Sequence, residues 1–356
     1  GVRIFTGNIK QYTFDKILDK IGTKGYSQRR LAVSCSFSYF KKDCEPLIKK
    51  FLKLSKKNQV PVIIHLDGVN WWAKRPDLWN WWDPDQPGYD PDNVHNVEWY
   101  DWGAEHAVKI GWRNWGQQIR VKPKPNLASP EVRKAQKKEL NELIPIITEW
   151  YQELPADKKY LLGGVVMGWE VSPYNSAFYY PNGNSYLNKD PKKDPEGGSS
   201  EAIALGYNAA QTLGIQQKGI ITEDTIDVIV KDYLDFLTEI ALKNNLPGHK
   251  IINHTLMGKK TKRGGGHSGA GALVDGVFSD NVIPGWSFYN KKPETADHLL
   301  DKINGKPWAA IEFPSSGLSN EDLVKDFFNY RNCRYINFFV WELGIRDYEE
   351  RIKVIS

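Results

Sequence analysis

Two glutamates in this chain follow apolar, strand-like runs, and their placement suggests a pair of catalytic carboxylates. Glu170 follows residues 164–169, and Glu312 follows residues 308–311. A carboxylate at the edge of a buried strand costs free energy unless it has a partner or a chemical task. For either glutamate alone, an ion pair with a nearby Lys or Arg is a sufficient explanation.

Two carboxylates that face one pocket can perform acid–base and nucleophilic chemistry together. Their mutual repulsion separates the two pKa values, so that one group stays protonated while the other stays ionised. Cleavage of a glycosidic bond requires this combination. An acid protonates the leaving oxygen, and a carboxylate attacks the anomeric carbon or activates a water molecule. Glu170 and Glu312 are therefore the candidate catalytic residues.

The elements that would position these residues alternate between short apolar runs and helical patterns, as parallel βα units do. We expect strands at residues 31–37, 60–66, 117–121, 160–169, 250–253, either 273–278 or 285–288, 308–311 and 335–340. We expect helices at about residues 45–57, 131–153, 222–244, 293–303 and 320–331, the second bent or interrupted at Pro145.

Eight strands with helices between them predict an α/β fold, a (β/α)8 TIM barrel that forms a single domain over residues 1–356. In this count Glu170 ends the fourth strand and Glu312 the seventh. An open doubly wound sheet is the alternative, but no glycine-rich phosphate loop follows the first strand.

The active sites of such barrels lie at the C-terminal ends of the strands. The polar and aromatic residues that end the expected strands are His65, Asp67, Glu170, Asn253, His254, Tyr289, Glu312, Trp341 and Glu342. This set predicts an acid-rich, aromatic mouth, in which His65, Asp67 and His254 contact the substrate or support groups that do.

Two long insertions interrupt the barrel pattern, at about residues 68–118 and 171–220. The first holds nine of the 14 tryptophans, and a loop of this length is normally functional or a linker. Aromatic rings stack on the apolar faces of pyranoses, while Asp, Asn and Gln bind their hydroxyls. We therefore expect Trp71, Trp72 and Trp115 to bind a sugar; the alternative is that most of these tryptophans pack the loop against the barrel.

With these features, the sequence resembles the retaining glycoside hydrolases of clan A, a large group of (β/α)8 enzymes. The resemblance rests on Gly168-Trp169-Glu170 and Ala310-Ile311-Glu312-Phe313, which match the strand-four and strand-seven motifs of the clan. It covers the strand framework but not the Trp-rich insertion. It implies a carbohydrate substrate and a double displacement, with Glu170 as acid/base and Glu312 as nucleophile.

The resemblance also implies further site residues. In many members a Tyr near strand six hydrogen-bonds the nucleophile, and a Trp that ends strand eight forms the floor of a sugar subsite; Tyr289 and Trp341 match them. The clan usually has Asn directly before the acid/base, in contact with the sugar 2-hydroxyl. Trp169 stands there instead, so we expect Trp169 to contact the sugar and Asn175 or Asn253 to bind the hydroxyl.

Composition and charge argue against several other classes. The formal net charge is only +5, and the lysine clusters are scattered along candidate helices instead of forming one basic face. Aromatic and basic residues in the first insertion could stack on single-stranded nucleic acid, but Asp83, Asp85, Asp90 and Asp92 would repel phosphates. No apolar run reaches the roughly 18 residues of a membrane span.

Metal and serine chemistry are weaker alternatives. His65, Asp67 and His254 could converge on a metal ion, but no HxH or HExxH spacing occurs, so we expect neither a metal nor a cofactor. A Gly-x-Ser-x-Gly nucleophile motif is also absent. An inverting glycosidase and a non-catalytic sugar-binding barrel remain open, as do a Cys35–Cys44 pair, the cellular compartment and the oligomeric state.

Overall fold

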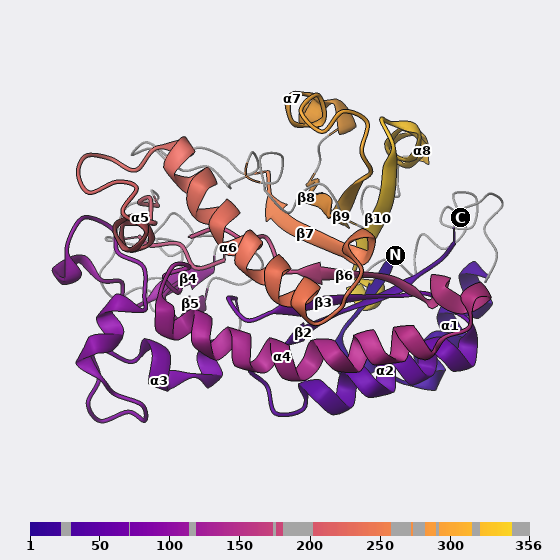
Figure 1. Ribbon diagram of the computed structural model, residues 1–356, viewed down its shortest axis with the longest axis horizontal. Helices are drawn as coiled ribbons and strands as arrows, with labels where there is room; N and C mark the ends of the chain where they lie inside the picture. Colours follow the sequence, from indigo (N-terminus) through magenta and orange to yellow (C-terminus); the bar gives the residue numbers. More distant parts are fainter. Residues whose placement is uncertain are drawn as a thin grey trace.

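Strands and helices alternate along the chain in the computed structural model, and the strands close into a barrel (Figure 1). The structure describes residues 1–22, 30–70, 72–113, 119–173, 176–180, 202–257, 272, 282–289, 292–314 and 321–343. Three of the residues expected at the site, Trp71, Trp115 and Asn175, lie outside these ranges.

Eight parallel strands form the closed barrel, which confirms the predicted TIM-barrel fold. In their order around the barrel they are β1 (Val2–Ile4), β10 (Cys333–Phe339), β9 (Trp308–Pro314), β8 (Ile283–Ser287), β7 (Ile251–Leu256), β6 (Leu162–Met167), β3 (Val62–Asp67) and β2 (Val33–Ser38). The barrel closes at Val2, which pairs with Val33 on one side and with Phe338 on the other.

Two expectations about the strands were wrong, and their errors offset each other. The first barrel strand is β1, whose three residues are too few to give a periodic signal. The run at 117–121 is not a barrel strand, because β5 (Ile119–Val121) pairs antiparallel with β4 (Gly111–Arg113) outside the barrel. Glu170 therefore still follows the fourth barrel strand, and Glu312 lies in the seventh.

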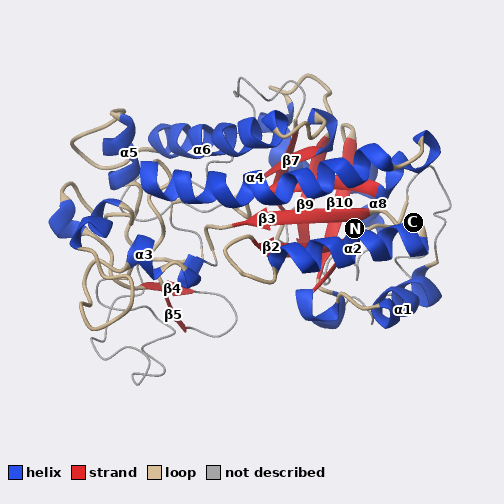
Figure 2. Cartoon of the chain, turned by 60° about the horizontal axis from the view of Figure 1, so that its bottom comes forward, coloured by secondary structure: helices blue, strands red, loops and turns tan. Residues whose placement is uncertain are grey.

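Helices connect the strands and cover the outside of the barrel. They are α1 (Gln11–Ile21), α2 (Cys44–Asn58), α4 (Pro130–Glu153), α6 (Glu223–Lys243), α7 (Asp297–Leu300) and α8 (Glu321–Asn329). Figure 2 shows α2, α4 and α6 running along the barrel. Ser129 caps α4, since its hydroxyl accepts the Val132 amide. The helix continues through Pro145, so the expected interruption there does not occur.

The barrel interior is filled by aliphatic side chains at its lower level. They form one buried cluster, made up of Ala32, Ile63, Val166, Ile252, Ile283, Ala309 and Ile311. Inward-facing side chains alternate along each strand, so the next inward positions on β3 and β7 are His65 and His254, both fully buried. The polar side chains of the barrel interior therefore begin in the layer next to this apolar cluster, on the side of the C-terminal strand ends.

The insertions lie beyond the C-terminal end of the barrel. The first begins at the end of β3 and contains α3 (Pro76–Trp79), β4 and β5, while the second contains α5 (Tyr207–Leu213). Figures 1 and 2 show these elements together at one end of the molecule. Within the described ranges, no helix combines the length and hydrophobicity needed to cross a membrane. Cys35, Cys44 and Cys333 are buried, and Cys35 and Cys44 do not form the disulfide that the sequence left open.

Candidate active site

The two predicted glutamates meet at the C-terminal mouth of the barrel. One carboxylate oxygen of Glu170, one of Glu312 and one ring nitrogen of His254 all lie within 4.8 Å of one another. All three residues are buried, with 7%, 3% and 0% of their surfaces exposed. Glu170 reaches this position from the turn after β6, and Glu312 from β9.

A strand irregularity explains how Glu312 enters the mouth. Along β9 the pairing with β8 skips one residue, since Ala310 faces Trp286 and Glu312 faces Ser287. A similar shift separates β9 from β10 at the same point. A bulge re-aims the side chains that follow it, so Glu312 lies at the mouth directly after the inward-facing Ile311.

Glu312 is held by a cation and by an indole. Arg3 Nη1 donates to Glu312 Oε1 at 2.7 Å, and Trp169 Nε1 donates to Oε2 at 2.8 Å. The Arg3 guanidinium also lies 4.8 Å above the Trp169 ring. A buried, charge-assisted contact of this kind stabilises the ionised carboxylate. Both carboxylate oxygens of Glu312 therefore have donors, and one donor is positively charged.

Glu170 has neutral donors instead. The Ser287 and Tyr289 hydroxyls donate to Glu170 Oε1 at 2.5 and 2.9 Å. The expectation that Tyr289 bonds Glu312 is therefore corrected, because the phenol hydroxyl donates to Glu170, while Arg3 and Trp169 donate to Glu312. Burial, with the charges of Glu312 and Glu170, raises the pKa of the Tyr289 phenol well above its ordinary value. Tyr289 thus stays protonated and can only donate to Glu170.

His254 completes the surroundings of Glu170. The Glu170 amide donates to His254 Nδ1 at 3.4 Å, and His254 Nε2 lies 2.9 Å from Ser287 Oγ. Burial, and next the charge of Arg3, lower the pKa of His254 well below its ordinary value. A neutral ring that accepts at Nδ1 carries its proton on Nε2. The protons therefore run from His254 to Ser287 and from Ser287 to Glu170.

His65 lies beside Arg3, whose Nη2 is 3.3 Å from His65 Nδ1. Burial and the nearby charge of Arg3 lower the pKa of His65 well below its ordinary value, so the ring is neutral. Asp67 accepts the backbone amides of Val69 and Asn70, which closes the turn after β3. Burial raises the pKa of Asp67 to about 6. In these contacts His65 supports Arg3, and Asp67 shapes the loop.

Two residues expected to bind substrate do not reach the site. Asn253 lies on the opposite face of β7 from His254, and its Oδ1 accepts the Thr238 hydroxyl of α6. Trp72 is 2% exposed, and its indole donates to the Pro123 carbonyl at 3.0 Å. Trp341, two residues after the end of β10, is buried as well. A role for Trp341 as a subsite floor stays a prediction.

The described tryptophans of the first insertion pack the insertion itself. Trp79, Trp99 and Trp112 are buried, while Trp81, Trp82 and Trp102 are half-buried. Several of their indoles donate to backbone carbonyls, as Trp99 does to Val94 and Trp102 does to Gly219. For these residues the packing alternative therefore accounts for the aromatic content.

Sequence reasoning missed Arg3, Ser287, Asn70 and Lys124 among the residues of the site. Arg3 had a usable signal, because it stands between Val2 and Ile4 in an apolar run, where a lone cation needs a buried partner. The other three lie at strand ends or in loops, and only the fold brings them near the glutamates.

Glu170, His254 and Glu312 could together offer three ligand atoms to a divalent cation. This set differs from the alternative metal set that the sequence suggested, since His65 and Asp67 are not part of it. Its atoms already have other partners: Arg3 ion-pairs with Glu312, and His254 is bonded at both ring nitrogens. The donors therefore fit an acid–base site better than a metal centre.

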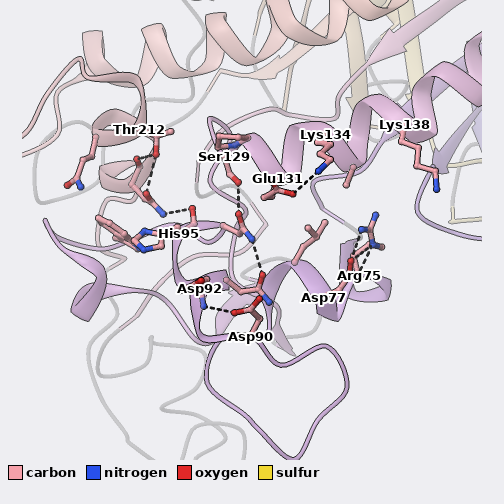
Figure 3. Close-up of a pocket in the computed structure, with 18 residues that line it drawn as sticks. Arg75, Asp77, Asp90, Asp92, His95, Ser129, Glu131, Lys134, Lys138 and Thr212 are labelled. Carbon is pink, nitrogen blue, oxygen red and sulfur yellow. Dashed lines mark hydrogen bonds and ion pairs between the residues drawn. The ribbon is translucent and has the colours of Figure 1, made fainter.

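A separate cavity of 870 Å³ lies away from the barrel mouth (Figure 3). It is bounded by the first insertion, the start of α4 and α5, and contains none of the predicted site residues. Its polar groups largely bond one another, as Arg75 does with Asp77 and Ser129 does with Asn96.

No protein-family model matches the chain, and no curated protein sequence matches it. The fold and the site therefore define the class by themselves: an α/β barrel with a buried pair of carboxylates at the C-terminal mouth.

Proposed function

We propose that the protein is a retaining glycoside hydrolase that cleaves an oligo- or polysaccharide. The observation that carries the proposal is the pair Glu170 and Glu312, whose nearest oxygens lie within 4.8 Å at the barrel mouth. Retaining glycosidases hold their two carboxyl groups about 5–5.5 Å apart, and inverting ones about 6.5–9.5 Å apart. The short separation supports direct attack by a carboxylate over attack by an interposed water.

The unequal surroundings of the two carboxyl groups support their roles. Glu312 contacts the Arg3 guanidinium, which favours the anion that a nucleophile must be. Glu170 receives the neutral hydroxyls of Ser287 and Tyr289 and lies close to the charge of Glu312. A carboxyl group in that setting can carry a proton while Glu312 stays ionised.

In the proposed reaction, Glu312 attacks the anomeric carbon as the bond to the leaving oxygen breaks. Glu170 gives its proton to that oxygen, so a glycosyl-enzyme ester and a free alcohol result. The Glu170 carboxylate then takes a proton from a water molecule, whose oxygen attacks the anomeric carbon and releases Glu312. Two inversions leave the anomeric configuration unchanged, and no cofactor enters either step.

Screening a glycan panel for hydrolysis, with product anomers followed by NMR, tests the proposal. The first-formed product should keep the configuration of the substrate, and inversion would contradict the double displacement. Glu312→Ala should abolish turnover while the protein still folds. Glu131→Gln, which changes an exposed carboxylate on α4, is the matched control and should retain activity.

Glu170→Ala separates the acid from the nucleophile. Loss of the acid should slow poor leaving groups by about 100-fold or more, and activated aryl glycosides, which need little protonation, far less. An equal effect on both substrate types would remove Glu170 from the role of general acid. Activity lost on chelation would instead favour a metal-dependent hydrolase that uses Glu170, His254 and Glu312 as ligands.

A further inference from the structure

Lys124 is buried close to Glu170, the candidate acid/base, although it belongs to the segment that leads from the first insertion back to the barrel. Lys124 stands between β5 and α4, and only 1% of its surface is exposed. Burying an ammonium costs several kcal/mol unless it has partners. No carboxylate among the described residues forms an ion pair with it, so its position calls for a different explanation.

The backbone around Lys124 is fixed. Pro123 and Pro125 flank it, and each proline restricts the dihedral angles of its own residue and of the one before it. The Lys124 carbonyl accepts the Glu98 amide at 2.8 Å, and the Pro123 carbonyl accepts the Trp72 indole. The packing of the insertion therefore determines where the lysine side chain begins.

The side chain ends in a short chain of hydrogen bonds that leads to Glu170. Lys124 Nζ donates to Asn70 Oδ1 at 2.6 Å, and Asn70 Nδ2 donates to the Trp169 carbonyl at 2.9 Å. Asn70 is itself held at the end of β3, because its amide donates to Asp67. Lys124 thus reaches the peptide unit that joins Trp169 to Glu170.

That peptide unit lies in a strained turn. Glu170 has a φ of +46°, in the left-handed region that non-glycine residues adopt at a cost of about 1–3 kcal/mol. The unit is held at both ends, since Asn70 binds its carbonyl and His254 accepts its amide. These two contacts fix the direction in which the Glu170 side chain leaves the backbone.

We propose that Lys124 and Asn70 are positioning residues for Glu170, through which the packed insertion holds the acid/base in its reactive orientation. The catalytic part of this inference rests on the proposed hydrolase function. The insertion then has a role in turnover that does not require its tryptophans to touch a sugar.

The positive charge of Lys124 has a second consequence for Glu170. Burial lowers the pKa of Lys124 to about 8, opposed by the charges of Asp67 and Glu170. Among the residues that the structure describes, groups that face Glu170 include Ser287 and Tyr289 from β8 and its end, His254 from β7, Glu312 from β9 with its partner Arg3, and Lys124. Of these groups, Lys124 and Arg3 are the cationic ones, and Lys124 favours ionised Glu170. Its removal should make Glu170 hold its proton to higher pH.

The test compares Lys124→Met and Asn70→Ala with Lys122→Met as matched control, each in the full chain. Lys122 lies two residues earlier, and its ammonium faces the Trp79 ring at 3.7 Å instead of the mouth. Both test variants should lose about tenfold or more in kcat/KM on a poor leaving group, and less than about threefold on an activated aryl glycoside. In Lys124→Met the basic limb of the pH profile should move upward, and Lys124→Arg should restore it.

Hydrogen exchange gives a readout that does not need activity. In a peptide spanning residues 166–172, exchange at the Glu170 amide should be faster in Lys124→Met and Asn70→Ala, and unchanged in Lys122→Met. If the chain hydrolyses no glycan, faster exchange still supports the positioning role while the hydrolase proposal fails. If Lys124→Met does not fold, Asn70→Ala decides. Unchanged exchange, or an unchanged ratio between the two substrates, overturns the inference.

Discussion

Removal of Arg3 is the sharpest test of the site, because its result does not depend on knowing the substrate. Arg3→Met keeps much of the side-chain volume but leaves Glu312 buried, with the Trp169 indole as its one remaining donor among the described residues. Breaking a buried pair in this way typically costs about 3–5 kcal/mol. A simple Coulomb estimate for 2.7 Å gives about 6 kcal/mol at an effective dielectric constant near 20, which lies above that range because it leaves out relaxation of the unpaired group.

The assay is a double-mutant cycle by urea unfolding with Arg3→Met, Glu312→Gln and the combined variant. At neutral pH we expect a coupling free energy of about 2–4 kcal/mol, because the single variants each leave one group unpaired and the double variant leaves neither charge. A coupling below about 0.5 kcal/mol, the usual scatter of independent sites, would refute the reasoning.

Two further perturbations test other parts of the structure. Tyr289→Phe removes a donor to ionised Glu170, so the basic limb of the activity profile should move to higher pH; movement of the acidic limb instead would mean that the phenol acts on Glu312. Burial raises the pKa of Glu98 from 4.5 to about 8, so folding binds a proton there and the carboxyl increasingly destabilises the fold as pH rises from 4.5 to 8. Glu98→Gln should therefore gain stability relative to the unaltered chain over that window, by on the order of 1.4 kcal/mol per unit of pKa difference. A difference in the free energy of unfolding that does not change with pH would contradict this.

The sequence predicted the barrel and the two carboxylates because both depend on local pattern. Apolar runs such as 164–169 and 308–311 give strands, and parallel strands bring their C-terminal ends to one edge. The order of strands survived two errors, since β1 was overlooked and a hairpin strand was counted in its place. The identity of the fourth and seventh strands therefore did not depend on finding every strand.

The contacts of the site could not be predicted in the same way. Tyr289 was expected on Glu312, but its hydroxyl donates to Glu170, and the donors to Glu312 are Arg3 and Trp169. Asn253 ends an expected strand, yet its side chain faces α6. A shift of one residue in the register of a strand moves every side chain to the opposite face of the sheet. An apolar run in the sequence does not determine that register to within one residue.

By itself, then, the sequence determined the strand-and-helix alternation and the end of the barrel to which Glu170 and Glu312 belong. Only the tertiary structure decided that Arg3 from β1 neutralises Glu312, and that Lys124 braces the turn of Glu170 through Asn70. The physical reason is how far apart in the sequence the interacting residues lie. Hydrophobic periodicity is written in neighbouring residues, whereas a hydrogen bond of 3 Å between residues about 300 positions apart depends on the closure and register of the whole barrel.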